Sequence, residues 1–408
     1  QCLGNRNDFF VVKNDIRCLM TNFESLLNKF DVFTATVHET KPDIIFGTET
    51  WLKTDITDDF VNIPGFHSFR TDTSEVRGGV IIYVRDTLKA FLCKKLTELK
   101  VKDILWVWVR NPGKADNLFG VVYRKGDSSQ EHNMMILKQL ELANSICKGK
   151  IMVTGDFNLP LIDWKNCIVQ DREGSFSHMF YDKLNDLFME QHMVEPTRQR
   201  GEAVPSCLDL IISSNDFDIS NIVIDCPLGK GDHSVITWDY LQNFENKSGQ
   251  DVYRFDYNKA DYEKMNQLLS EKDWSLVTSA TDVSDAWEHL NTALANIVNE
   301  CVPKVKITSG TKVKPPWFNI TAKRAVRRKY FAWKRYLETR SYTRYREYVK
   351  RRNKATKKLR IIKRNYEKEL CKQIKRNPKA FYLYVNSKNK ARSTITGLRK
   401  EDGSTTSV

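Results

Sequence analysis

The chain has 408 residues, of which 41% are hydrophobic and 28% charged, and it carries a net charge of +14 at pH 7. This length is enough for two or three domains, each with a core of its own. No apolar run reaches the length of a membrane span and no charged-then-apolar leader opens the chain, which argues against a membrane or secreted protein. The nine cysteines are scattered without a CxxC pair, so we expect reduced thiols in the nucleus and cytoplasm. Because the first residue is Gln rather than Met, we also expect a piece of a longer protein.

Short apolar runs of strand length dominate the first 240 residues. Several are rich in Val, Ile and aromatic residues and are bounded by Gly, Pro, Asp or Asn, as is typical of β-strands. The expected strands cover residues 16–22, 42–50, 78–84, 104–110, 118–124, 150–157, 207–213, 220–225 and 234–240. Three longer segments, 23–40, 131–146 and 176–191, have apolar residues at helical spacing. This succession predicts an α/β fold in which two mixed β-sheets pack together and are flanked by helices.

The character of the sequence changes after residue 242. Segment 243–318 begins with a polar loop at 244–251, continues with two expected helices, and ends in an extended linker at 306–317 that contains Pro315 and Pro316. Segment 319–408 is expected to be mainly helical. We therefore expect three parts, with boundaries at 1–242, 243–318 and 319–408.

The third part is strongly basic. Residues 323–392 hold 27 Lys and Arg against 4 Asp and Glu, whereas the rest of the chain holds 38 against 47. Aromatic residues are interleaved with these cations. Such a block is typical of a nucleic-acid-binding segment, whereas a merely solvated helix usually mixes charges of both signs.

Polar side chains recur at the ends of the expected strands. They are Asn22, Glu49, Tyr123, Asp156, Asn158, Asp209, Asp232 and His233. Each alone has an ordinary explanation, such as a turn residue, a surface acid or a core aromatic. Together they suit phosphodiester hydrolysis, which needs oxygen ligands for a hard cation such as Mg²⁺, a group that positions water, and a donor to the phosphoryl oxygens. The sequence contains no Cys/His metal cluster, P-loop or GxSxG motif that would support another kind of site.

The motifs "TNFESLLNK", "KPDIIFGTETWL", "RGGVIIYV", "GVVYR", "GDFN", "SCLDLIIS" and "GDHSVITW" occur in this order. As a set they resemble the endonuclease/exonuclease/phosphatase superfamily, and more narrowly the endonuclease domain of non-LTR (LINE-type, jockey- and CR1-like) retrotransposons. The resemblance covers about residues 14–240. Farther on, "PPWFN", "NPKAFYLYV" and "ITGLRKEDGS" resemble the connector that precedes the reverse transcriptase of those polyproteins.

The resemblance implies a DNase-I-like four-layer α/β sandwich and a Mg²⁺-dependent endonuclease, with Mn²⁺ as an alternative metal, that nicks target DNA. The basic segment would bind element RNA. The chain lacks a YxDD or FxDD motif, so it should not polymerise DNA by itself.

The resemblance also assigns roles around the metal. Glu49 would be the principal Mg²⁺ ligand, and Asn22 would order the metal and phosphate site. Glu24 would assist the metal. Asp156 would position or activate the water, with Asn158 beside the scissile phosphate.

The remaining roles concern the phosphate, the metal and the DNA. Tyr123 would contact it, and His233 would stabilise the transition state with Asp209 orienting its ring. Asp232 would lie near the metal, and Thr197 would be a weaker candidate for contact with DNA.

One position departs from the family pattern. The family often has Ser-Asp-His where this chain has Gly231 before Asp232 and His233, so a hydroxyl contact to phosphate is missing. A catalytically decayed nucleic-acid-binding remnant is therefore an alternative. A lipid- or inositol-phosphate phosphodiesterase and an abasic-site repair enzyme are the nearest alternatives within the superfamily, because a fold alone does not separate them. The basic segment argues against a lipid- or inositol-phosphate substrate. The connector-like segment argues against a stand-alone repair enzyme.

Overall fold

The part of the chain that the computed structural model describes comprises residues 15–111, 113–200, 203–214, 219–241, 253–255, 257–306, 315–386, 397–399 and 405–407. By its internal contacts the chain divides into two compact units, Gln1–Phe244 together with Lys312–Val408, and Glu245–Thr311. The loop expected at 244–251 and most of the linker expected at 306–317 lie outside the described residues. Among the described helices, none combines the length and the apolar character needed to cross a membrane.

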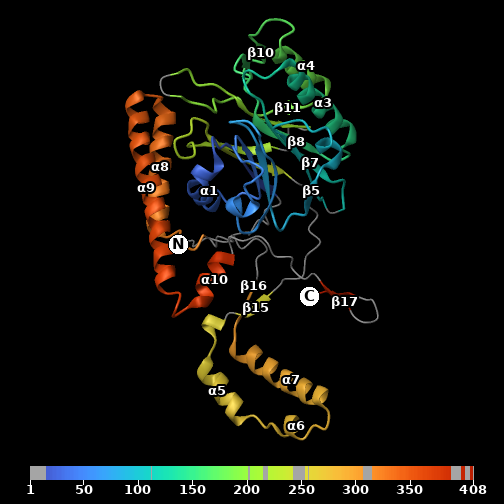
Figure 1. Cartoon of the computed structure of the whole chain (residues 1–408), viewed down its shortest axis with the longest axis vertical. Coiled ribbons are helices and arrows are strands. Elements are labelled where there is room, and N and C mark those ends of the chain that lie inside the picture. Colours follow the sequence, from blue (N-terminus) through green and yellow to red (C-terminus); the bar gives the residue numbers. More distant parts are fainter. Residues whose placement is uncertain are drawn as a thin grey trace, which may run out of the picture. The chain divides into compact units, whose positions relative to one another are not determined.

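A six-stranded sheet with the order β13-β14-β1-β2-β4-β3 forms one half of the core of the first unit (Figure 1). Its strands are β1 (Asp15–Asn22), β2 (Ile44–Thr48), β3 (Phe66–Thr71), β4 (Val80–Arg85), β13 (Ile219–Asp225) and β14 (Val235–Leu241). The central strands β1 and β2 are parallel, and all other neighbours are antiparallel.

A second six-stranded sheet has the order β11-β12-β8-β7-β6-β5. Its strands are β5 (Ala90–Leu92), β6 (Ile104–Val109), β7 (Asn117–Tyr123), β8 (Ile151–Asp156), β11 (Glu190–Gln191) and β12 (Asp209–Ser213). Here β7 and β8 are the parallel pair. Two very short strands, β9 (Ile162–Asp163) and β10 (Ile168–Val169), pair with each other outside this sheet.

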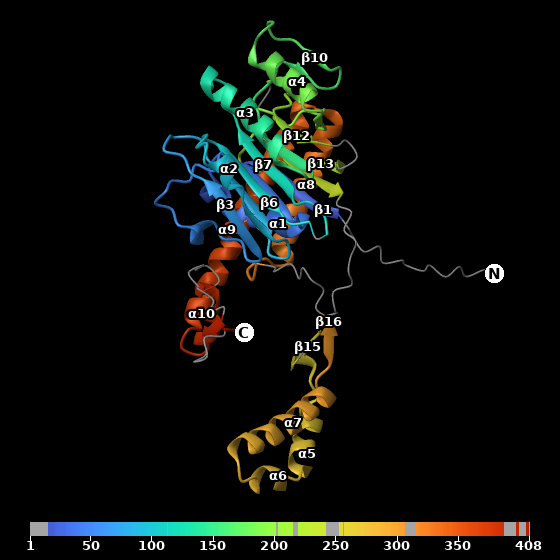
Figure 2. The ribbon, with the colours of Figure 1, turned by 90° about the vertical axis from the view of Figure 1, so that its right-hand side faces the viewer.

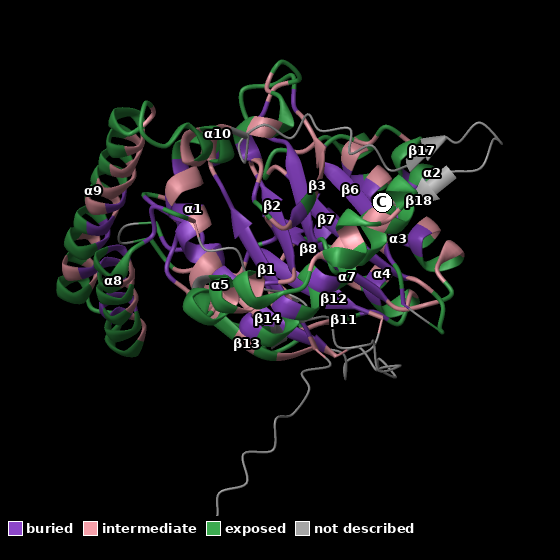
Figure 3. Ribbon diagram, turned by 90° about the horizontal axis from the view of Figure 1, so that it is seen from below, coloured by how far each residue is buried: buried purple, intermediate pink, exposed green. Residues whose placement is uncertain are grey.

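The two sheets bury their apolar faces against each other. Phe46 of the first sheet stacks on Trp238 at a ring-centroid distance of 6.0 Å and lies 6.4 Å from Phe119 of the second sheet. All three side chains are fully buried. Seen from below, the buried strands occupy the centre of the unit and exposed helices lie outside them (Figure 3).

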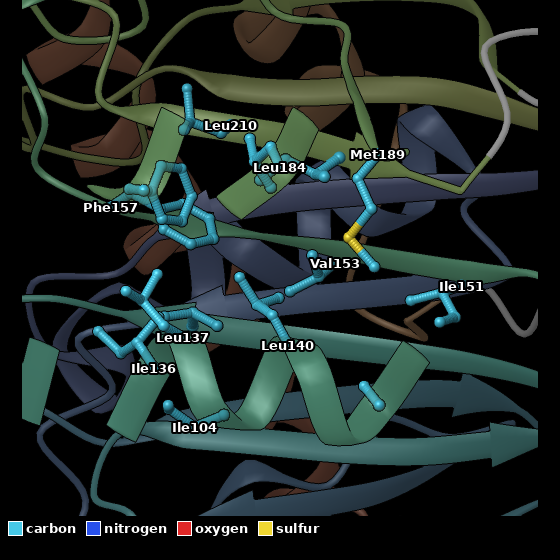
Figure 4. Packing of buried hydrophobic residues seen from close by; sticks show 14 of the residues in the cluster. Ile104, Ile136, Leu137, Leu140, Ile151, Val153, Phe157, Leu184, Met189 and Leu210 are labelled. Atoms are coloured by element: carbon cyan, nitrogen blue, oxygen red, sulfur yellow. The ribbon is translucent and has the colours of Figure 1, made fainter. Parts of the chain in front are cut away.

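Helices cover the outer faces of both sheets. Helix α1 (Leu26–Thr40) lies over the first sheet, while α3 (Gln130–Ile146) and α4 (Phe176–Asp186) lie over the second (Figure 2). The apolar side of α3, including Leu140, packs on β8 through Val153 (Figure 4).

Local sequence signals explain where two of these helices begin. The hydroxyls of Ser129 and Ser175 accept hydrogen bonds from the backbone N–H groups of His132 and His178, and so cap α3 and α4. Two shorter helical segments complete this part of the chain, η1 (Asp58–Val61) and α2 (Lys94–Thr97).

The predicted fold class is confirmed, and all nine expected strands are present. Strand β3 was not predicted. It lies at the edge of its sheet, and only its first residue is fully buried. Its sequence, "FHSFRT", therefore lacks the apolar run that marks an internal strand. The three-residue β5 and the two-residue β9, β10 and β11 were also missed.

Two long basic helices pack against each other in the first unit, and the second of them also packs against α1 (Figure 1). They are α8 (Ile320–Thr339) and α9 (Tyr342–Lys372), and a shorter helix, α10 (Pro378–Asn386), follows. The Asn319 side chain caps α8 by accepting the N–H of Ala322 at 3.0 Å. Arg340 ends α8 in the left-handed conformation, and Ser341 caps α9. The result is a helical hairpin.

The hairpin shares its core with the first sheet. Trp317 and Phe318, just before α8, belong to the same buried cluster as Phe23 and Leu26. The Phe318 ring also lies 4.9 Å from that of His38 on α1. The first unit therefore includes residues from both ends of the described chain.

The second unit is small and mainly helical. It contains a two-stranded sheet of β15 (Tyr253–Phe255) and β16 (Lys304–Lys306), with η3 (Tyr257–Lys259), α5 (Tyr262–Glu271), α6 (Ser275–Thr278) and α7 (Val283–Cys301). Near the C-terminus, β17 (Gly397–Arg399) pairs with β18 (Thr405–Ser407).

Candidate active site

The predicted site residues lie where the central strands of both sheets end. In the parallel pair β1 and β2, Asn22 is opposite Thr48, and Glu49 follows directly. In the second sheet Tyr123 is opposite Asp156, which is also paired with the first residue of β12, Asp209. The carboxyl ends of parallel strands meet at one edge of a sheet, which places these polar groups together.

An asparagine joins the two sheets at this edge. The Asn22 amide donates to Glu49 Oε1 at 2.9 Å and to Asp156 Oδ2 at 3.0 Å. The Asn22 carbonyl oxygen accepts the backbone N–H of Glu24 at 3.1 Å, which fixes which end of the side chain donates. The indole N–H of Trp51 donates to the other Glu49 oxygen at 3.1 Å. Both carboxylates are therefore held close to one point.

His233 lies between two buried carboxylates. Its Nδ1 is 2.8 Å from Asp209 Oδ2, and its Nε2 is 3.7 Å from Asp156 Oδ2. The three residues are each 5% exposed or less. Burial alone lowers the pKa of His233, but the charges of Asp209 and Asp156 outweigh it and raise the pKa to about 10. The ring therefore carries a proton at neutral pH.

The loop that carries His233 is fixed by the segment before β12. The backbone N–H of Ser234 donates to Thr197 O at 2.7 Å, and that of Gln199 donates to Asp232 O at 2.8 Å. The Thr197 hydroxyl accepts the N–H of Asp209 at 3.0 Å. Thr197 is fully buried, so the DNA contact expected of it is corrected to a structural role in placing Asp209 and His233.

The end of β8 has an unusual backbone that directs its polar groups. Gly155 has a φ of +148°, and a Cβ there would lie 1.9 Å from the carbonyl oxygen of Val122, so only glycine fits. Three residues later Asn158 has a φ of +52° and its N–H donates to Asp156 Oδ1 at 3.2 Å. Burial raises the pKa of Asp156 to about 7, against the lowering effect of the His233 charge. Both side chains line the same cavity.

Tyr123 extends the cluster from β7. Burial raises the pKa of its hydroxyl, and the negative charges of Glu49 and Asp156 raise it further. The hydroxyl therefore keeps its proton and can donate a hydrogen bond to an anion in the cavity.

Glu24 and Asp232 form a second acidic pair at the mouth of the site. Burial raises the pKa of Glu24, and the neighbouring Asp232 carboxylate adds to this. Burial opposes the ionisation of Asp232, but Glu24, His233 and Arg198 together lower its pKa. Lys29 Nζ lies 3.0 Å from Glu24 Oε2, and Arg198 Nε lies 3.0 Å from Asp232 Oδ2. These two acids are therefore largely neutralised within the protein.

Gly231 does not have a positive φ. A Cβ at this position would lie 3.1 Å from Lys29 Nζ and 3.2 Å from the carbonyl oxygen of Leu228. The ammonium group of Lys29 thus lies beside the place that a side chain of residue 231 would take.

One cavity of about 970 Å³ unites these groups. Its walls include Glu24, Glu49, Tyr123, Asp156, Asn158, Asp232 and His233. Asn22 and Asp209 do not line the cavity, but they hold Glu49 and His233 in place through hydrogen bonds. The structure thus brings together all nine residues predicted for the site.

Three participants were not predicted, namely Trp51, Lys29 and Arg198. Trp51 stands two residues after Glu49, but nothing in the sequence shows that its N–H turns back to that carboxylate. Lys29 lies only five residues after Glu24 and Arg198 lies 34 residues before Asp232, and in neither case does the sequence show that the cation turns toward the acid. Only tertiary contacts reveal them.

The oxygen donors at this edge fit a divalent cation. Glu49 and Asp156 converge on one amide, and a hard cation takes one or two carboxylates and completes its shell with water. Asp156, Asp209 and His233 also offer ligand atoms within 4.8 Å of one another. In that triad, however, the Asp209 hydrogen bond already occupies His233 Nδ1. Glu49 and Asp156 are the better metal-holding pair.

Comparison with solved structures finds several similar chains. The "Endonuclease domain of TRAS1, a telomere-specific non-LTR retrotransposon" is 18% identical, with a TM-score of 0.45, covering 56% of this chain and 99% of that one. An AP endonuclease from Archaeoglobus fulgidus is 16% identical, with a TM-score of 0.42 and coverage of 55% and 99%. The 3′-5′ exonuclease NExo from Neisseria meningitidis is 15% identical, with a TM-score of 0.43 and coverage of 56% and 100%.

No curated protein matches the chain by sequence. A family profile does match, over residues 18–233, which is more than half of the chain and includes all nine residues of the site. The chain therefore belongs to the endonuclease/exonuclease/phosphatase family.

Proposed function

We propose that this chain is a Mg²⁺-dependent phosphodiesterase that nicks DNA, with Mn²⁺ as an alternative metal. The observation that carries the proposal is the joined arrangement of Asn22, Glu49, Asp156, Asp209 and His233 at one edge of two packed sheets. It combines a site for a hard cation with a protonated imidazole only a few ångströms away.

Glu49 and Asp156 would hold the metal, which would supply positive charge to the phosphate when bound. Asn22 keeps the two carboxylates at a fixed separation. Asp156 would also position the attacking water, because its carboxylate lines the cavity beside the metal-holding Glu49. Glu24 and Asp232 have a supporting role, since Lys29 and Arg198 already neutralise them.

His233 acts on the phosphoryl oxygens. Asp209 binds Nδ1, so the proton on Nε2 points to the cavity and can be donated to an oxygen that gains charge in the transition state. Tyr123 and Asn158 line the same cavity and would donate to the phosphate from its other sides. The site is thus prepared for a pentacovalent phosphorus without needing to rearrange.

The basic helical hairpin supports a polynucleotide rather than a small phosphate ester as substrate. Helices α8 and α9 share the core of the site-bearing unit, and Tyr345 of α9 lines the site cavity. The order of motifs and the C-terminal segment resemble retrotransposon polyproteins, so we propose that the chain nicks target DNA for retrotransposition. Residues 319–408 would lead toward a reverse transcriptase, and the part of this segment that does not face the candidate active site would bind element RNA. Such a protein would be made in the cytoplasm and act in the nucleus.

A nicking assay on supercoiled plasmid tests this function. The wild type should nick with Mg²⁺ and not with EDTA, while Glu49→Gln and Asp156→Asn should each lose at least about 10³-fold in rate. Both changes are nearly isosteric, so circular dichroism should stay unchanged. Glu173→Gln, at an exposed turn outside the cavity, is the matched control and should nick normally. Equal nicking by wild type and both site variants would refute the assignment.

A further inference from the structure

A second cavity, of about 620 Å³, lies between α1, the loop before His233 and α9. Four of its lining side chains are cations, namely Lys29, Lys230, Lys357 and Arg360. None of the described residues that line it is a carboxylate. This groove is therefore built for an anion.

The groove shares part of its wall with the candidate active site. Lys230 lines both cavities, and Tyr345, in the first turn of α9, lines the site cavity as well. Lys230 is only three residues before His233. A strand that enters the site would therefore reach α9 without crossing an unrelated surface.

Most of the positive charge in the groove is uncompensated. Within the described parts of the chain, the charged groups of Lys230, Lys357 and Arg360 have no ion-pair partner, whereas Lys363 on the same helix pairs with Asp31 at 2.6 Å. Lys29 is the only one of the four lining cations with such a partner in the described chain, Glu24. Exposed cations without partners repel one another, which favours binding of a polyanion.

The cations of the groove belong to a longer stripe on α9. Arg346, Lys350, Lys357, Arg360 and Arg364 are all exposed, and their spacing of three, four or seven residues places them on one face of the helix. We call this the α9 stripe. It begins near the hairpin turn, where Tyr345 reaches the site cavity.

We propose that the groove and the α9 stripe bind the phosphates of the DNA strand that flank the phosphodiester in the candidate active site. This inference rests on the proposed function, since it takes the occupant of the groove to be the substrate strand. The shared wall at Lys230 favours DNA over a separate RNA ligand, because one polymer would occupy both cavities. The contacts are to phosphates, so they add affinity without sequence preference.

Binding of the full-length protein to a short DNA duplex, measured by fluorescence anisotropy in EDTA, tests the groove without cleavage. The variant Lys357→Gln/Arg360→Gln should bind roughly ten- to thirtyfold more weakly at moderate salt, and its log–log salt slope should be shallower by about 1.8. The control Lys354→Gln/Lys358→Gln removes the same charge from the same helix at positions that line neither cavity, and should change binding little.

The outcomes separate this inference from the proposed function. Equal losses of DNA affinity in the two double variants would mean that only net charge matters, and would overturn the proposal that the groove binds DNA. A variant that loses affinity for single-stranded RNA but keeps its affinity for duplex DNA would overturn it too. If the groove variant binds DNA weakly as expected but the wild type fails to nick plasmid with Mg²⁺, the groove is supported and the proposed function is refuted.

Discussion

In the candidate active site the charged groups are buried and held by partners, whereas on the α9 stripe the cations are exposed. Asp209 and His233 are joined at 2.8 Å, and both are 5% exposed or less. Lys357 and Arg360 have no ion-pair partner among the described residues and face the groove. Burial of charge costs stability unless hydrogen bonds compensate it, but it fixes atoms in place. A charge left exposed to solvent costs little stability, but its side chain is not held in one position.

The difference indicates two separate tasks. A group that must donate a proton to one oxygen needs a fixed position, and the site provides it through Asp209, Thr197 and Asn22. A surface that attracts a strand needs only charge of one sign. Substitutions in the first region should therefore change the rate of catalysis, and those in the second should change affinity.

The largest expected effect concerns the buried pair. His233→Ala should lower the nicking rate by about 10²–10³ because it removes a donor to the transition state. Asp209→Asn should lower it as well, because the ring loses the carboxylate that keeps it protonated. The double variant should be little worse than His233→Ala alone, since the two residues act as one unit. Additive losses in single-turnover nicking rates would show that they act independently.

A smaller effect is expected on stability as a function of pH. The pKa of His233 is raised from 6.5 to about 10 on folding, so its contribution is fully present below pH 6.5 and is lost as the pH rises through about 10. In EDTA, the free energy of unfolding from urea titrations should therefore fall between pH 7 and 10. The fall should be weaker in His233→Asn. The exposed His67→Asn serves as the control, and an equal fall in all three proteins would contradict the buried pair.

The smallest effect concerns Gly231, at the boundary of the two regions. Its φ is not positive, and a side chain there fits once Lys29 Nζ, at 3.1 Å from the Cβ, and the Leu228 carbonyl oxygen, at 3.2 Å, move away by a few tenths of an ångström. Gly231→Ser should raise nicking by about fivefold, the value of one hydrogen bond of about 1 kcal/mol. Gly231→Ala adds the same Cβ without the hydroxyl and is the matched control. Equal rates for Ser and Ala would rule out a missing contact to phosphate.

Much of the fold followed from the sequence because internal strands carry local signals. The run before Asp156 and the run before Glu49 are apolar, so their ends were predictable, and the polar groups at those ends were predicted together. Edge strand β3 was missed because solvent permits polar residues along most of it. An apolar run indicates that a strand is buried, so this signal is missing from a strand that is only partly buried.

The parts of the candidate site that depend on contacts between different segments could not be predicted from the sequence. Segment 319–408 was expected to be mainly helical, but the sequence did not reveal that α8 and α9 would share a core with α1. Trp51 and Lys29 were missed for a similar reason, because each acts on a carboxylate through a side-chain direction that the sequence does not encode locally. The family resemblance assigned Thr197 to contact with DNA, and its full burial corrected this.

The discontinuous first unit has a consequence for synthesis on the ribosome. Strand β14 ends at Leu241, but Trp317 and Phe318, which cover α1, come more than seventy residues later, after the whole second unit. At usual translation speeds of about 5–20 residues per second, this delay is about 4–15 s. During that time the side of α1 around Phe30, Val37 and His38, where Trp317 and Phe318 pack in the completed chain, stays uncovered in the nascent chain. The unfinished protein would therefore present a chaperone-binding surface that the completed protein hides.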